Sequence, residues 1–218
     1  MWHADIVMID GTVKGYLFVV VEYVTNYTFV KQILSATHAQ IICAPYGPMI
    51  LVARYAMAVV PVEFDDDQTI ESYQHLYDFH IRRGPPGEHE RVVERWIRYM
   101  REKFRSAVAS AGYHVPYCVY PNVVEHIAKV YNLLPNAKSE GTDSPLRRFE
   151  RNVGLAETIV TVDELQVGVL DIVTINDNRQ KNIAKGNNPH RTNILVTSIE
   201  FGNGAKITGI PLDTSTRK

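Results

Sequence analysis

The chain is poor in cysteine, in long apolar runs and in basic residues at its start. Its 218 residues include two cysteines, Cys43 and Cys118, which form neither a CxxC pair nor a disulfide framework. We expect both to be packing residues of a protein from a reducing, intracellular compartment. No run of about 18 apolar residues occurs, so neither a membrane-spanning helix nor a membrane partner is expected. The first residues lack the basic and apolar segments of a signal peptide.

Two common kinds of ligand site are also missing. No P-loop and no dinucleotide-binding glycine fingerprint is present. His75, His80 and His89 fall close together, but no cysteine pair accompanies them, so a zinc site is not expected. Hydrophobic residues make up 45% and charged residues 22% of the chain, which is typical of a soluble globular protein of one or two domains.

Positive and negative charges nearly balance overall, but the positive charges are concentrated in one stretch. The net charge of -1 argues against a uniformly basic nucleic-acid binder. Residues 82–105, however, contain eight arginines or lysines against four glutamates, a net charge of +4 that leaves -5 for the rest. Such a stretch is either a solvated helix face with ion pairs four residues apart or a local basic stripe that contacts phosphate.

The first third of the chain has the pattern of short strands joined by turns. Strands are predicted over residues 5–10, 16–23 and 27–33, with glycines in the first turn and Asn26 in the second. This order predicts an antiparallel meander. A helix interrupted by Pro45 and Pro48 is expected between residues 35 and 58, followed by a strand over 59–64, a short helix over 69–76 and a strand over 77–81.

Helices dominate the middle of the chain. After the Gly-Pro-Pro-Gly break at 84–87, apolar residues fall on one stripe of a helix that begins near His89. A second helix is predicted over 120–134. Together these elements predict an α/β fold, a mixed sheet flanked by helices. We expect a core domain over residues 1–135, a linker over 136–158 and a small β-rich appendage over 159–218.

Three acidic positions are candidates for a metal site. Asp5 lies in the first predicted strand, Asp65 ends the fourth, and Glu94 lies near the start of the strongly patterned helix. Clustered carboxylates repel one another unless a cation is present, and their oxygens suit Mg²⁺ or Mn²⁺. Two such ions are able to promote phosphodiester transfer. The acidic triplet 65–67 is equally consistent with a turn or a helix cap.

Glu94 also has a simpler interpretation. At 100° per residue it lies about 120° from the apolar stripe, on the side that carries several arginines. It is therefore either a metal ligand or an ion-pair partner of Arg98, four residues later.

Several segments resemble the catalytic core of retroelement integrases, in the RNase H-like superfamily. Residues 2–6, 15–21 and 25–30 resemble the family's opening strands, and 61–65 resemble the strand that carries its second aspartate. Residues 87–95 resemble the glycine, histidine and Val-Glu-Arg signature of the third ligand. Downstream, residues 132–136, 144–145 and 188–192 resemble markers of Copia-like LTR retrotransposons.

The resemblance implies an RNase H-like mixed five-stranded sheet flanked by helices. It implies a polynucleotidyl transferase for DNA integration, with Asp5, Asp65 and Glu94 as catalytic residues that bind two Mg²⁺ or Mn²⁺ ions. DNA would be the partner, a homo-oligomer would assemble on it, and the site of action would be the nucleus. Arginines of the patterned helix are the expected phosphate contacts: Arg91, Arg95, Arg98, Arg101 and Arg105.

The chain departs from the family pattern in three ways. The 28 residues between Asp65 and Glu94 are fewer than the family usually has, and the triplet leaves Asp66 and Asp67 as alternative second ligands. The zinc module and reverse transcriptase that accompany such cores are not found, so a fragment of a longer polyprotein is expected. The alternative hypotheses are an inactive integrase-fold protein that binds DNA or another partner, and an RNase H-type hydrolase.

Overall fold

The computed structural model describes residues 2–7, 16–33, 62–64, 81–83, 91–135, 143–160, 168–176, 191–201 and 206–212. Within these residues, helices and strands are mixed in the chain order, as the sequence predicts. The helices expected over 35–58 and 69–76 lie outside the described residues. None of the helices in the described part is long and apolar enough to cross a membrane.

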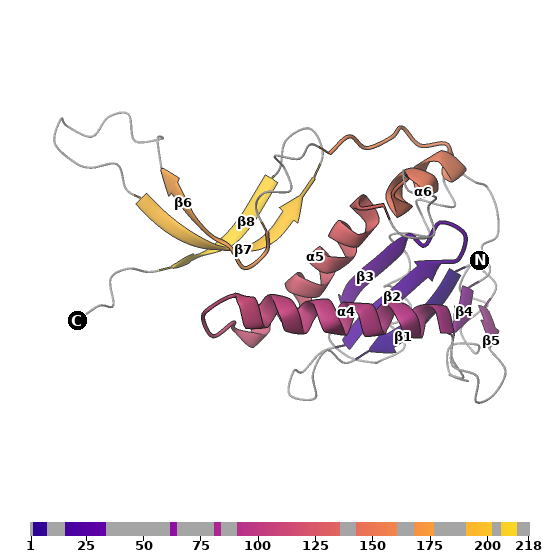
Figure 1. Cartoon of the computed structure of the whole chain (residues 1–218), viewed down its shortest axis with the longest axis horizontal. Coiled ribbons are helices and arrows are strands. Elements are labelled where there is room, and N and C mark those ends of the chain that lie inside the picture. The colour runs from indigo at the N-terminus through magenta and orange to yellow at the C-terminus, as the bar shows by residue number, and fades with distance from the viewer. Residues whose placement is uncertain are drawn as a thin grey trace.

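Five strands hydrogen-bond in the order β3-β2-β1-β4-β5 (Figure 1). Their bounds are β1 Trp2–Val7, β2 Tyr16–Glu22, β3 Thr28–Ile33, β4 Val62–Phe64 and β5 Ile81–Arg83. β1, β2 and β3 form the predicted antiparallel meander. β4 pairs in parallel with the edge of β1 opposite to β2, and β5 pairs in parallel with β4. β1 begins three residues earlier than predicted, because Trp2 pairs with Glu22 at the far end of β2.

A buried glutamate closes the turn between β2 and β3. The Glu22 carboxylate accepts hydrogen bonds from the backbone N–H of Val24 at 3.1 Å and of Thr25 at 2.6 Å. It also accepts one from the Thr25 hydroxyl at 2.7 Å. Asn26 has a φ of 58°, a left-handed conformation that asparagine adopts more readily than most residues. The predicted turn at Asn26 is therefore confirmed.

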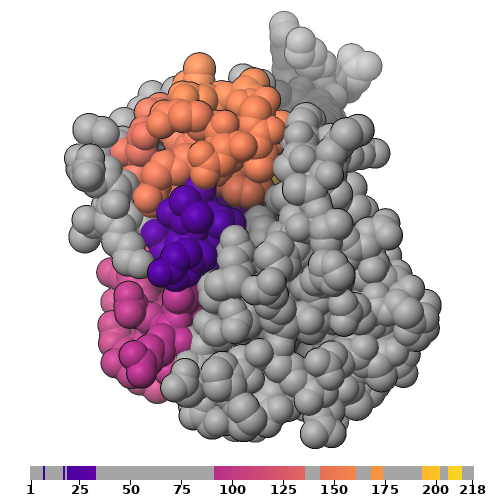
Figure 2. Space-filling model, turned by 90° about the vertical axis from the view of Figure 1, so that its right-hand side faces the viewer, coloured from indigo at the N-terminus to yellow at the C-terminus, as the bar shows by residue number. Residues whose placement is uncertain are grey.

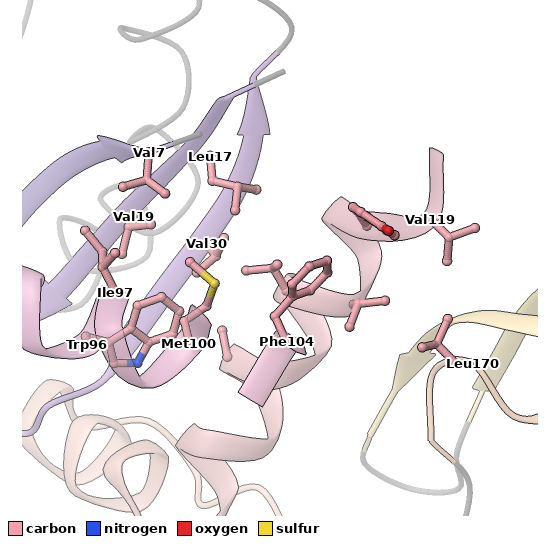
Figure 3. Close-up of a cluster of buried hydrophobic side chains, with 14 of the residues drawn as sticks. Val7, Leu17, Val19, Val30, Trp96, Ile97, Met100, Phe104, Val119 and Leu170 are labelled. Carbon is pink, nitrogen blue, oxygen red and sulfur yellow. The ribbon is translucent and has the colours of Figure 1, made fainter. Parts of the chain in front are cut away.

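Helix α4 (Arg91–Ser110) packs its predicted apolar stripe on the sheet. Five stripe residues are buried: Val93, Trp96, Ile97, Met100 and Phe104. In Figure 3 the last four of these lie beside Val7, Leu17, Val19 and Val30 from the first three strands, and Val93 belongs to the same cluster. Met100 is fully buried in this core. The 3.6-residue periodicity of the sequence thus correctly predicts which side of α4 faces the sheet.

Helix α5 (Tyr120–Leu133) covers the edge of the sheet at β3 and follows a short 3-10 turn, Tyr117–Val119. The Asn132 side chain pairs with the backbone of Thr28, the first residue of β3. Its Oδ1 accepts from the Thr28 N–H at 2.9 Å, and its Nδ2 donates to the Thr28 carbonyl at 2.6 Å. The amide thus occupies the place of a neighbouring strand, which satisfies backbone groups that an edge would leave unpaired.

Helix α6 (Pro145–Val153) lies within the segment expected to be a linker. Ser144 is its N-cap and accepts a hydrogen bond from the Arg147 N–H at 3.2 Å, while Pro145 occupies the first turn. Gly154 ends the helix with a φ of 73°. The Phe149 ring stacks on Tyr27, with centroids 4.4 Å apart. Figure 2 shows α6 and the segment after it (orange) against the β2–β3 hairpin (indigo), with α4 (magenta) below.

Buried Glu150 fixes the chain after α6. Its carboxylate accepts hydrogen bonds from the backbone N–H of Thr158 at 2.9 Å and from the Thr158 hydroxyl. Residues 143–160 are therefore bound to the core by α6 rather than being a free connection, although the division into domains stays a prediction.

The predicted β-rich character of the tail is confirmed. β6 (Ile172–Asn176), β7 (Arg191–Glu200) and β8 (Lys206–Leu212) form an antiparallel sheet in the order β6-β7-β8. Leu170 and Leu195 are buried in the same hydrophobic cluster as α4 and α5. The tail is thus packed against the helices.

Candidate functional site

Asp5 occupies a central position in β1. It pairs with Val19 of β2, which is fully buried in the core beneath α4. Helix α4 packs on β1 through this core, to which Val7 of β1 also belongs.

The parallel pairing of β1 with β4 ends one residue before the second predicted aspartate in the sequence. The paired residues are Trp2 with Val62, His3 with Glu63 and Ala4 with Phe64. Asp5 is the next residue of β1 after the last pair, and Asp65 is the next residue of the sequence after β4. Asp65 and its alternatives, Asp66 and Asp67, lie outside the described residues.

Glu94 lies in the first turn of α4, and its side chain is exposed. It projects about 100° from the centre of the buried stripe. No ion pair joins Glu94 to Arg98 in the part of the chain that the structure describes. The simpler interpretation of Glu94, as the partner of Arg98, therefore receives no support from the geometry.

The solvent side of α4 carries a row of arginines. All five predicted phosphate contacts are exposed: Arg91, Arg95, Arg98, Arg101 and Arg105. They recur every three or four residues, so they follow one side of the helix over about 21 Å. Lys103 extends over the ring of Tyr99, 5.7 Å from its centroid. A row of exposed guanidinium groups of this length is suited to contacts with several phosphates in succession.

The metal site predicted from the sequence stays a prediction. Within the described residues, no group of three or more histidine, cysteine, aspartate or glutamate side chains is placed to hold a metal ion. Among the three predicted ligands, Glu94 is the one whose side chain the structure describes, while Asp5 is described by its backbone.

Sequence patterns did not predict a role for the partly buried histidine of α5, His126. His126 is partly buried, and its pKa is lowered to about 4, first by burial and then by the nearby Lys129, while Asp171 opposes this effect. Its neighbours Gly168, Asp171 and Phe201 come from the C-terminal sheet region, more than 40 residues away in the sequence. No local pattern marks such a residue, since its burial depends on how the tail packs.

The solved structures that are similar to this chain include two retroviral integrase catalytic cores. The catalytic core domain of BIV integrase has a TM-score of 0.49 and 16% sequence identity, and the match covers 69% of this chain and 93% of that chain. The catalytic core domain of HTLV-2 integrase, in complex with magnesium and in a trimeric form, has a TM-score of 0.47 and 14% identity, covering 66% and 91%. No protein-family model and no curated protein matches the chain.

Proposed function

We propose that this chain is an integrase-type polynucleotidyl transferase, which cleaves and joins DNA for a Copia-like retrotransposon with the help of divalent metal. Asp5, Asp65 and Glu94 are its catalytic carboxylates. The observation that carries the proposal is the parallel register of β1 and β4, which ends one residue before each aspartate. Neighbouring parallel strands in register bring successive residues side by side, so this register favours two adjacent carboxylates.

Helix α4 supplies the third group of the proposed site. It packs on β1, the strand that contains Asp5, and it carries Glu94 in its first turn. The donor set consists of carboxylates, which is the chemistry that Mg²⁺ and Mn²⁺ require. With two ions bound, the metal would supply activation of the attacking oxygen and stabilisation of the leaving oxygen. The role of the three side chains is to hold and orient that metal.

The arginine row of α4 would bind the DNA backbone. Guanidinium groups contact phosphates without reading the base sequence, so binding is expected to be independent of sequence and to weaken steeply with salt. Assembly of a homo-oligomer on DNA and action in the nucleus are further parts of this proposal.

A disintegration assay, which measures the reversal of DNA joining on a branched substrate, tests the proposed activity. The purified chain is incubated with Mn²⁺ beside the variants Asp5→Asn, Glu94→Gln and Glu102→Gln. Glu102 is a matched control, because it is another exposed glutamate of the same helix. We expect product from the unmodified chain and from Glu102→Gln, and none from Glu94→Gln or Asp5→Asn. Equal product from Glu94→Gln would refute the role of this carboxylate.

The exposure of Glu94 favours a second candidate, an inactive integrase-fold protein that binds DNA through the arginine row. A glutamate that projects toward solvent among arginines is poorly placed for a ligand of a metal beside β1. Calorimetry with Mn²⁺ separates the two candidates. Heat of binding that is absent from Asp5→Asn supports the active site, whereas no heat from a folded chain that still binds DNA supports the inactive protein. Cleavage of an RNA–DNA hybrid in place of duplex DNA would indicate an RNase H-type hydrolase.

A further inference from the structure

Polar contacts join the C-terminal sheet to α5 and to the segment before it. The Lys129 ammonium of α5 donates a hydrogen bond to the Ile199 carbonyl of β7 at 3.0 Å. Ahead of α5, the Tyr113 hydroxyl donates to the Leu170 carbonyl at 2.6 Å. The buried side chains of Leu170 and Leu195 add apolar contacts. In Figure 1 this sheet lies beside the helices, apart from the strands β1 to β5.

His126 lies at this junction and fits it as a neutral ring. Its Nδ1 atom is buried and has no hydrogen-bond partner among the described residues. The ring lies 6.2 Å from the ring of Phe201, at the end of β7. On its other side is Gly168, where an added Cβ would be 4.0 Å from the His126 Nε2. The imidazole is therefore enclosed by α5 and by both ends of the tail sheet's first hairpin.

The charged groups around His126 disfavour a positive charge on its ring. Lys129 follows one turn later on α5, and the pKa of His126 is lowered to about 4 by burial and by this ammonium. Asp171, just before β6, acts in the opposite direction. Its Oδ2, however, already accepts a hydrogen bond from the Gly168 N–H at 2.6 Å. Phe201, the neighbour from the end of β7, is uncharged.

We propose that this junction is an acid-sensitive joint, in which a proton taken up by His126 releases the β6-β7-β8 sheet from α5 while the β1–β5 sheet stays folded. In the docked state a protonated ring has a buried N–H without an acceptor, which is unfavourable. In the released state water hydrates the ring. The core around Val19 and Met100 does not contain His126. On release it would lose its contacts with Leu170 and Leu195 but keep those between α4 and the first three strands.

The direction of the pH dependence follows from the two protonation equilibria. A released His126 has an ordinary pKa near 6.5, whereas the docked residue has a pKa of about 4. Below pH 6.5 the released state binds more protons, so docking is strongest above pH 6.5 and weakens as the pH falls toward 4. The docking equilibrium constant decreases by on the order of a hundredfold over this range.

The distance between two spin labels tests the proposal. Glu102→Cys on α4 and Thr208→Cys on β8 provide exposed attachment sites, with Cys43→Ser and Cys118→Ser in the same chain. The label distance is measured by pulsed electron resonance from pH 7.5 to pH 4, with far-ultraviolet circular dichroism on the same samples. We expect a longer, broader distance to appear as the pH falls from 6.5 to 4, while the helical signal persists.

Three variants identify the responsible group. His126→Phe keeps a ring against Phe201 but does not titrate, so its distance is expected to stay short at every pH. His126→Lys carries a permanent charge and is expected to be released at pH 7.5. His114→Phe removes an exposed histidine outside the junction and should behave like the parent chain.

Three outcomes would overturn the proposal. One is a parent chain that keeps the short distance at pH 4. Another is a His126→Phe variant whose label distance lengthens at low pH as it does in the parent chain. The third is loss of the helical signal at the same pH as the change in distance, which would mean general acid unfolding. Should His126→Phe fail to fold, His126→Gln takes its place with the same readout.

Discussion

Replacing Asn132 by alanine removes the two hydrogen bonds by which α5 pairs with the start of β3. Thr28 is 1% exposed and Asn132 is 6% exposed, so water does not replace the lost partner without movement of the helix. The change leaves a buried N–H and a buried carbonyl of Thr28 without the Asn132 amide. An unsatisfied buried group costs about 1–3 kcal/mol. We therefore expect the free energy of unfolding to fall by about 2–4 kcal/mol.

Urea unfolding followed by circular dichroism measures this change, and thermal unfolding provides a second readout. For a chain of this size, 1 kcal/mol corresponds to a Tm shift of roughly 2–4 °C, so the midpoint should fall by roughly 4–16 °C. Asn122→Ala is the matched control, because Asn122 is a partly exposed asparagine of the same helix with no hydrogen-bond partner among the described residues, and surface changes stay within about 0.5 kcal/mol. Equal effects of Asn132→Ala and Asn122→Ala would falsify the pairing of α5 with β3.

Three further predictions concern the core, a helix cap and the arginine row. Met100→Ala should lower the free energy of unfolding by about 2–5 kcal/mol, because Met100 is fully buried between α4 and the sheet; a loss under 1 kcal/mol in urea unfolding would contradict the packing. Ser144→Ala should cost about 1 kcal/mol by removing the bond to the Arg147 N–H, whereas Ser144→Asp, which keeps an acceptor, should recover most of it in the same assay. Under the proposed function, Arg98→Ala should reduce the slope of log affinity for duplex DNA against log salt by about 1, measured by fluorescence anisotropy. An unchanged slope would exclude Arg98 from the phosphate contacts.

Local patterns predicted the elements whose periodicity is strong. The apolar stripe of α4 repeats every three or four residues over 20 residues, so its buried side was evident before the fold was known. The strands of the meander were predicted for a similar reason, since runs of β-branched and aromatic residues are separated by Gly and Asn turns. Their ends were less certain, because the extension of β1 to Trp2 depends on its pairing with Glu22.

The segment 136–158 shows where composition misleads. Its serine, glycine and charged residues are typical of a linker, yet Ser144 and Pro145 begin a capped helix. That helix is held in place by the stacking of Phe149 on Tyr27, a residue far away in the sequence. A short helix with one buried ring has too few apolar positions for a periodic signal, so tertiary contacts decide whether it forms.

The amino-acid sequence by itself determined the antiparallel meander, the two long helices, the exposed arginine row and the candidate carboxylates, because these depend on periodicity and on residue chemistry. The tertiary structure alone decided which distant groups meet. Asn132 reaches Thr28 across 104 residues of chain, and the tail encloses His126 and lowers its pKa. Such pairings leave no local pattern in the sequence. Each partner is a common polar residue, and its special role arises only when the packing of the chain excludes water from around it.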